Sequence, residues 1–319
     1  MLLDEVPPWF LRVFAVVFGL LWGSFLNVVI YRVPREMSVV RPPSHCPACK
    51  QPIRAWQNVP LFGWLFMRGR ARCCGVEIPV RYPLVEAIGG VISLAVMEML
   101  VLRMSGSTSF ALAGGIYLVH LTLALGLVAA AFIDVEFMIL PDSMTIGGAV
   151  LGVLASPLRG MSIVDSLIGA AAGLAIVWLP FVVIYPKIRG KVGMGLGDAK
   201  LLMLAGAWFG WLGALVVLAA GAVQGTVFAV GTLLVGGKLE EPEAVRRERE
   251  EVMAELEQMS PEERAEAERE LADDPLMSEA GEGVGQARIA FGPFLILATL
   301  ELLLLREQLQ GVFSLWMGI

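Results

Sequence analysis

The sequence predicts an all-α polytopic membrane protein with about eight transmembrane helices and a small cytoplasmic, zinc-ribbon-like loop domain. Its 319 residues are 57% hydrophobic, and their mean hydropathy is +0.73, which is higher than in ordinary soluble domains. Apolar runs of at least roughly 18 residues, enough to cross a bilayer, recur along the whole chain. The first run is therefore more than a removable signal sequence. All four cysteines fall between Cys46 and Cys74, which indicates a local metal site or disulfide.

Residues 1–31 contain the first predicted transmembrane helix, whose apolar run extends from about Phe10 to Tyr31. Residues 32–82 form a basic, cysteine-containing loop with nine lysines and arginines and only two glutamates. By the positive-inside rule this loop is cytoplasmic, so the N-terminus lies outside.

Residues 83–237 form the predicted transmembrane core. Its expected spans lie at about 83–102, 110–133, 142–156, 166–185 and 199–236. The last of these, at about 1.5 Å per residue, is long enough for two spans that fold as a hairpin near Gly210. The alternation of loops places Asp134, at the end of one span, and Asp198, at the start of another, on the cytoplasmic side.

Residues 238–286 carry 17 acidic and 6 basic residues and too few apolar residues for a core. They predict a soluble insertion of exposed helix with disordered flanks, which is either a solvated spacer or a docking element for a partner. Ser260-Pro261-Glu262-Glu263 is typical of a helix start. Residues 287–319 contain the last span, from about residue 289 to 305, and the C-terminus.

Asp134 and Asp198 are the candidate catalytic residues, because a charge at the mouth of a membrane helix is expensive and usually functional. Two carboxylates that share a proton can activate water, one as base and one as acid, and hydrolyse a peptide bond. Gly195 and Gly197 would let an extended substrate approach the backbone closely. Alternatively, Asp198 only caps a helix that begins at Ala199, and Asp134 only solvates a helix end. The spacing leaves both interpretations open.

Lys200, in the same turn as Asp198, and Glu86, at the start of the span that follows the basic loop, are candidate supporting residues. Glu86 is an intramembrane carboxylate, and such groups usually have a partner on a neighbouring helix.

The four cysteines are the candidate metal ligands. The set consists of Cys46, Cys49, Cys73 and Cys74. One C-x-x-C knuckle with two later thiols predicts zinc, and a cytoplasmic location favours a metal over a disulfide. The alternative is a set of unliganded cysteines, since adjacent Cys73 and Cys74 strain tetrahedral ligation by both. His45 is then a substitute ligand.

A set of short segments is spread over nearly the whole chain outside residues 238–286. They are Gly23-Ser24-Phe25-Leu26-Asn27-Val28-Val29-Ile30-Tyr31-Arg32, Cys46-Pro47-Ala48-Cys49, Arg81-Tyr82-Pro83-Leu84-Val85-Glu86, Ile133-Asp134, Leu140-Pro141-Asp142, Gly195-Leu196-Gly197-Asp198 and Phe291-Gly292-Pro293-Phe294. Through these segments the chain resembles the bacterial type IV prepilin peptidases, a family of bifunctional leader peptidases and N-methyltransferases. Together these segments are very specific, whereas G-x-G-D alone is weak.

The resemblance implies that Asp134 and Asp198 are an aspartic protease pair that cleaves the short basic leader of type IV prepilins and type II secretion pseudopilins. Cleavage occurs at the cytoplasmic face of the bacterial inner membrane, and S-adenosylmethionine then methylates the new N-terminus. We find no G-x-G-x-x-G nucleotide loop, so methylation rests on the resemblance alone. The expected partners are these substrates and membrane lipid, with no nucleic acid.

The second cysteine pair departs from the family's C-x-x-C spacing. Ala71 stands where a partner of Cys74 would be, and Cys73 is an additional cysteine between them. A peptidase without methyltransferase activity is therefore an alternative. A cation or proton transporter that uses the two aspartates is a third hypothesis, but transporter sites usually lie near mid-bilayer rather than at span ends.

Overall fold

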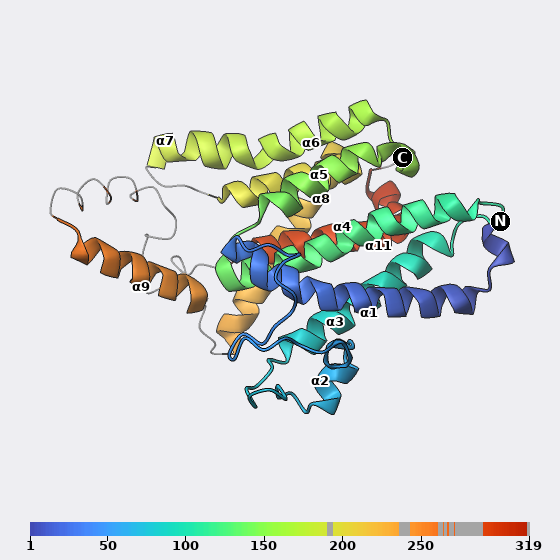
Figure 1. Ribbon diagram of the computed structural model, residues 1–319. Helices are drawn as coiled ribbons and strands as arrows, with labels where there is room; N and C mark the ends of the chain where they lie inside the picture. Colours follow the sequence, from blue (N-terminus) through green and yellow to red (C-terminus); the bar gives the residue numbers. More distant parts are fainter. Residues whose placement is uncertain are drawn as a thin grey trace. The chain divides into compact units, whose positions relative to one another are not determined.

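The computed structural model describes residues 1–189, 194–235, 243–260, 264, 267, 271 and 290–317, and helices dominate their secondary structure (Figure 1). The chain divides into two compact units. Unit 1 comprises Met1–Ala129, Pro157–Gly160 and Leu300–Ile319, and unit 2 comprises Ala130–Ser156 and Met161–Thr299. The predicted all-α class is confirmed.

Unit 1 is built on the crossing of α1 (Pro8–Arg32) with α3 (Arg81–Val96). A Cβ atom on Gly19 would lie 2.4 Å from the carbonyl oxygen of Gly89, and one on Gly23 would lie 2.8 Å from Cα of Glu86. Small residues let membrane helices approach this closely, because lipid provides no hydrophobic drive for helices to associate. The spacing Gly19-x-x-x-Gly23 thus sets the contact.

The remaining spans of unit 1 complete this packing. The π-helix η4 (Met97–Val101) continues α3, and residues 110–129 of the long helix α4 (Phe110–Phe137) also belong to unit 1. Ser93 on α3 forms hydrogen bonds with the carbonyl oxygen of Ala15 and with the hydroxyl of Tyr117, on α1 and α4. These bonds satisfy a polar group that would otherwise be costly inside a membrane.

The cysteine loop connects α1 to α3 and contains one short helix, α2 (Phe62–Phe66). Arg32, at the end of α1, is buried and donates to the carbonyl oxygens of Ser38 at 2.8 Å and Pro42 at 2.7 Å. A buried guanidinium needs such partners, so these bonds fold the first part of the loop back onto the helix end.

Unit 2 is built on the crossing of α6 (Ile163–Val177) with α8 (Leu196–Leu234). A Cβ atom on Gly206 would lie 2.0 Å from the carbonyl oxygen of Gly169, and one on Gly173 would lie 2.1 Å from that of Leu202. The π-helix η6 (Trp178–Ile184) and α7 (Tyr185–Arg189) extend α6. Both units therefore use a small-xxx-small helix contact.

The short helix α5 (Asp142–Leu154) packs against the first half of α8, where the indole of Trp208 donates to the carbonyl oxygen of Gly148 at 2.9 Å. Gly210 interrupts α8, because its φ of 76° and ψ of 177° are not helical. The expected break near this glycine is confirmed. The second half of α8 contacts α11 (Gly292–Met317), where a Cβ atom on Gly221 would lie 2.8 Å from Cδ2 of Leu295.

Five helices of the described residues are long and apolar enough to cross a membrane, whereas the sequence predicted about eight spans. They are Pro8–Arg35, Arg81–Val101, Phe110–Phe137, Ile163–Ile188 and Leu196–Leu234. The number differs because α8 counts as one helix across its break, and because Asp142–Leu154 and Gly292–Leu305 are shorter than a bilayer span. The chain is a multi-pass membrane protein.

The acidic segment contains the helix α9 (Glu243–Gln258). Val245 and Leu256 are each only 3% exposed, so one face of α9 is covered, unlike the fully exposed helix that we expected. Residues 261–263 of the expected helix start lie outside the described residues, and the role of the 238–286 segment stays a prediction.

Candidate active site and metal centre

Asp134 lies one turn before the end of α4 and is 5% exposed. The helix does not stop at this aspartate, as the sequence suggested, but continues to Phe137. It ends where Met138 adopts a left-handed conformation (φ 53°) and donates its N–H to the carbonyl oxygen of Asp134 at 2.8 Å. The carboxylate is thus held inside the protein. Its Oδ2 atom has no hydrogen-bond partner among the described residues.

Asp198 is the third residue of α8, which begins at Leu196 rather than at Ala199. Gly195 is the N-cap, and its backbone N–H bonds to the Asp198 carboxylate. This is the half of a capping box in which an acidic third residue reaches back to the cap. The capping interpretation is therefore right in part, with Gly195 rather than Asp198 as the N-cap residue.

The fold brings the two aspartates together within unit 2, although 64 positions separate them in the sequence. The charge of Asp134 acts electrostatically on Asp198. Asp134 reaches this place from the end of one helix and Asp198 from the start of another. Two neighbouring carboxylates in a partly dry environment are the arrangement that can hold one shared proton.

Leu140 lies between two glycines beside this pair. A Cβ atom on Gly197 would lie 3.1 Å from Cβ of Leu140, and one on Gly292 would lie 3.1 Å from its Cδ1 atom. Gly197 therefore serves packing. Gly195 is exposed and has room for a side chain, so of the two predicted glycines only Gly195 presents open backbone for a substrate.

Lys200 forms an ion pair with Asp142, the first residue of α5, at a distance of 2.5 Å. The pair joins the starts of α5 and α8 beside Asp198. Because the Asp142 side chain is 59% exposed, solvent screens this pair strongly.

Glu86 belongs to unit 1, whereas the aspartates belong to unit 2. Its buried carboxylate accepts the backbone N–H of Leu61 at 2.7 Å and a hydrogen bond from the side chain of Ser24. Leu61 has a positive φ of 61° with a ψ of −51°, a backbone conformation that is costly for a leucine. Glu86 thus fastens the cysteine loop to α1 and α3.

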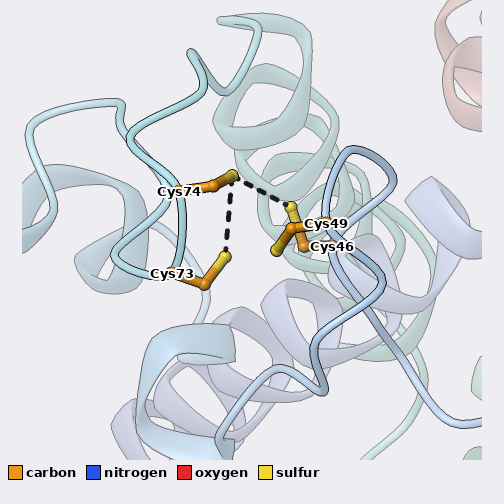
Figure 2. A group of neighbouring side chains, drawn as sticks. All are labelled: Cys46, Cys49, Cys73 and Cys74. Atoms are coloured by element: carbon orange, nitrogen blue, oxygen red, sulfur yellow. Dashed lines mark hydrogen bonds between the residues drawn. The ribbon is translucent and has the colours of Figure 1, made fainter.

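The four cysteine sulfurs form one cluster in unit 1, drawn in Figure 2. All four Sγ atoms lie within 4.8 Å of one another, with Cys46 and Cys74 at 3.7 Å and Cys73 and Cys74 at 3.9 Å. Tetrahedral zinc with Zn–S bonds of about 2.3 Å separates its sulfurs by about 3.8 Å. The cluster therefore fits zinc, and the adjacency of Cys73 and Cys74 does not prevent both sulfurs from facing the centre.

Two tight turns present these sulfurs. In the first turn, the N–H of Cys46 donates to the carbonyl oxygen of Gln51. The carbonyl oxygen of Cys46 accepts a hydrogen bond from the N–H of Lys50. In the second, Gly75 takes a positive φ of 74° and donates to the carbonyl oxygen of Ala71. The left-handed glycine compensates for the absent C-x-x-C spacing, because it reverses the chain directly after Cys74.

Backbone N–H groups favour the thiolate form of Cys46. The backbone N–H of Cys49 bonds to its thiolate and, with that of Ala48, lowers the pKa of Cys46 to about 6. The pKa of Cys73 is raised to about 12, chiefly by its hydrogen bond with Cys49. One thiolate stabilised by its neighbours is a good starting ligand for a cation. His45, the expected substitute ligand, is instead 3.0 Å from the carbonyl oxygen of Pro43 and is not part of the cluster.

Gly292 contacts Asp134 and was not predicted as a site residue. The sequence shows it only as part of Phe291-Gly292-Pro293-Phe294, and nothing in that pattern indicates which residue it faces.

Two family models match this chain. One, described as the bacterial peptidase A24 N-terminal domain, matches residues 17–100, and the other, described as the type IV leader peptidase family, matches residues 121–230. The second match contains both aspartates, and the first contains all four cysteines. No solved structure matches the chain.

Similar proteins carry the name prepilin leader peptidase/N-methyltransferase. That of Myxococcus xanthus (strain DK1622) is 41% identical over 239 residues, which cover 74% of this chain and 68% of the relative. That of Aeromonas hydrophila is 36% identical over 253 residues, covering 72% and 83%. That of Neisseria gonorrhoeae is 35% identical over 249 residues, covering 70% and 83%.

Proposed function

The chain belongs to the type IV leader peptidase family, and we propose that Asp134 and Asp198 are the aspartic pair with which it cleaves prepilins and pseudopilins. The single observation that supports this assignment is the approach of the two carboxylates inside unit 2, where the charge of one acts on the other. Each aspartate also forms a hydrogen bond at the end of its own helix, but these local bonds do not explain why the two carboxylates lie close together.

The pair would work as a base and an acid. One carboxylate takes a proton from a water molecule as its oxygen attacks the scissile carbonyl carbon. The other donates its proton to the carbonyl oxygen. When the tetrahedral intermediate collapses, the first carboxylate passes the proton taken from water to the leaving amine, and the second regains a proton from a hydroxyl group of the intermediate. Gly195 supports the approach of an extended chain, because it is exposed beside Asp198.

The loop charges support a cytoplasmic active site in the bacterial inner membrane, since the basic loop and the aspartates fall on the same predicted side. Eight spans remain compatible with the helices. The five candidates, a further span for the second half of α8 and the two shorter apolar helices would together account for them.

Methylation of the new N-terminus by S-adenosylmethionine is the second proposed activity, and the names of the relatives support it. Residues that hold this cofactor are not assigned. The four cysteines would hold zinc, which would rigidify the loop between α1 and α3. Zinc need not take part in cleavage, because the aspartates supply both proton transfers.

The test is to incubate purified protein with a prepilin and S-adenosylmethionine and to analyse the product by mass spectrometry. We expect a product that has lost its leader and gained one methyl group. A cleaved but unmethylated product would favour a peptidase that lacks the second activity. An intact leader, with a known leader peptidase active in the same mixture, would refute the proposal.

A further inference from the structure

Gly292, the first residue of α11, lies directly against the carboxylate of Asp134. A Cβ atom at this position would lie 2.4 Å from Oδ2 of Asp134, and 3.1 Å from its Cγ atom and from Cδ1 of Leu140. A contact below about 3.0 Å forces one of the groups to move. Gly292 does not have a positive φ, so this position requires glycine for space rather than for backbone conformation.

The start of α11 presents a backbone donor to this carboxylate. Phe294 and Leu295 donate their N–H groups to the carbonyl oxygen of Phe291, and Pro293 has no N–H. The backbone N–H of Gly292 interacts instead with the carboxylate of Asp134. Helix starts carry unsatisfied N–H groups and a partial positive charge, which suit an anion.

The carboxylate itself is the second, independent sign of a built contact. Asp134 is only 5% exposed, and its Oδ2 atom lacks a hydrogen-bond partner among the described residues. A buried, unpartnered carboxylate oxygen is costly and must be kept in place by its surroundings. Gly292 is part of those surroundings, and a single carbon atom added to it would overlap with this oxygen.

We propose that Gly292 is a positioning residue for peptide cleavage: the start of α11 closes over Asp134 and sets the orientation of its carboxylate toward Asp198. The inference rests on the proposed function of the two aspartates and adds a third chain segment to their site. Leu140 supports the arrangement, because it packs on Gly292, which contacts Asp134, and also on Gly197, which precedes Asp198 in the chain.

The Gly292→Ala variant tests this role. The added methyl group pushes aside the end of a short side chain rather than backbone, so the protein should fold while the carboxylate is displaced. Misplacement by about 1 Å costs roughly 10²-fold in rate. We expect kcat for prepilin cleavage to fall about 10²-fold while KM stays within about twofold. A merely structural defect would instead lower the amount of folded enzyme and leave kcat per folded molecule unchanged.

Gly126→Ala is the matched control. Gly126 also lies in a helix, α4, but a Cβ atom there would meet nothing within 4 Å. Its kcat should equal that of wild type. Asp134→Asn separates the two levels of inference: if this variant still cleaves, the proposed function fails. If wild type cleaves, Asp134→Asn does not, and Gly292→Ala matches wild type in kcat, only the positioning role is overturned.

A thermal double-mutant cycle decides the case in which Gly292→Ala does not fold. In the Asp134→Ala background the carboxylate is absent, so the added methyl group has room. We expect Gly292→Ala to lower the melting temperature in wild type but not in Asp134→Ala. An equal drop in both backgrounds would show that the methyl group clashes with something other than Asp134 and would overturn the proposal.

Discussion

The aspartate pair in unit 2 and the cysteine cluster in unit 1 bring together distant residues by different means. Asp134 and Asp198 stand on the ends of long helices, and their positions follow from how α4, α8 and α11 pack. The cysteines stand on two turns of a loop that has only one helix of five residues. Helix packing thus forms the first site, whereas the second is formed by turns whose four sulfurs fit a zinc ion.

The two sites also differ in how much change of sequence their backbones tolerate. The adjacent Cys73 and Cys74 are tolerated because Gly75 reverses the chain behind them. The aspartate site has no such freedom, since a single methyl group on Gly292 would reach the carboxylate. A loop adjusts its backbone, whereas packed helices do not.

The largest expected effect is on the aspartate pair. Asp198→Asn keeps the size of the side chain but removes a group that takes up or donates a proton. Cleavage should fall by about 10⁴-fold, the upper range for a general acid or base. The measurement is the initial rate of leader removal, with circular dichroism to confirm the helical content. Cleavage near the wild-type rate would show that the pairing is only structural.

The next effect should be confined to the cysteine cluster. Cys46→Ser removes its buried ligand and the thiolate with the lowered pKa, so the purified protein should lose its zinc. Metal content by elemental analysis measures this loss, and His45→Ala, outside the cluster, should keep the metal. Leader cleavage should stay within about threefold of wild type, because the proposed acid and base, Asp134 and Asp198, lie in the other unit. Zinc-free wild-type protein would contradict the assignment.

Glu86→Ala should have a smaller effect, on the attachment of the loop. It leaves the N–H of Leu61 without its acceptor, which costs about 1–3 kcal/mol when the group is buried. Limited proteolysis should then cut the cysteine loop faster, while Glu86→Gln, which keeps an acceptor oxygen, should resemble wild type more closely. Equal protease resistance in all three proteins would exclude an anchoring role.

The smallest effect should follow from Lys200→Met. The ion pair with Asp142 is largely exposed on the aspartate's side, and such pairs contribute about 0–1 kcal/mol. The melting temperature should hardly change, and cleavage should fall by less than about fivefold, which is about 1 kcal/mol. Asp142→Asn provides the matched measurement. A loss of a hundredfold or more in Lys200→Met alone would instead place the lysine in contact with the substrate.

The sequence by itself determined the all-helical membrane class and the basic loop, and it predicted the two aspartates as candidate catalytic residues, because hydropathy, charge asymmetry and an isolated carboxylate beside an apolar run are local properties. It also indicated the break near Gly210, since glycine among aromatic residues interrupts an apolar helix. The tertiary structure decided what depends on packing. It showed that Gly197 packs on Leu140 while Gly195 is open, that Cys73 and Cys74 both face the cluster, and that Gly292 meets Asp134. No periodicity encodes these contacts, because each joins segments whose positions are set only when the helices and turns pack together.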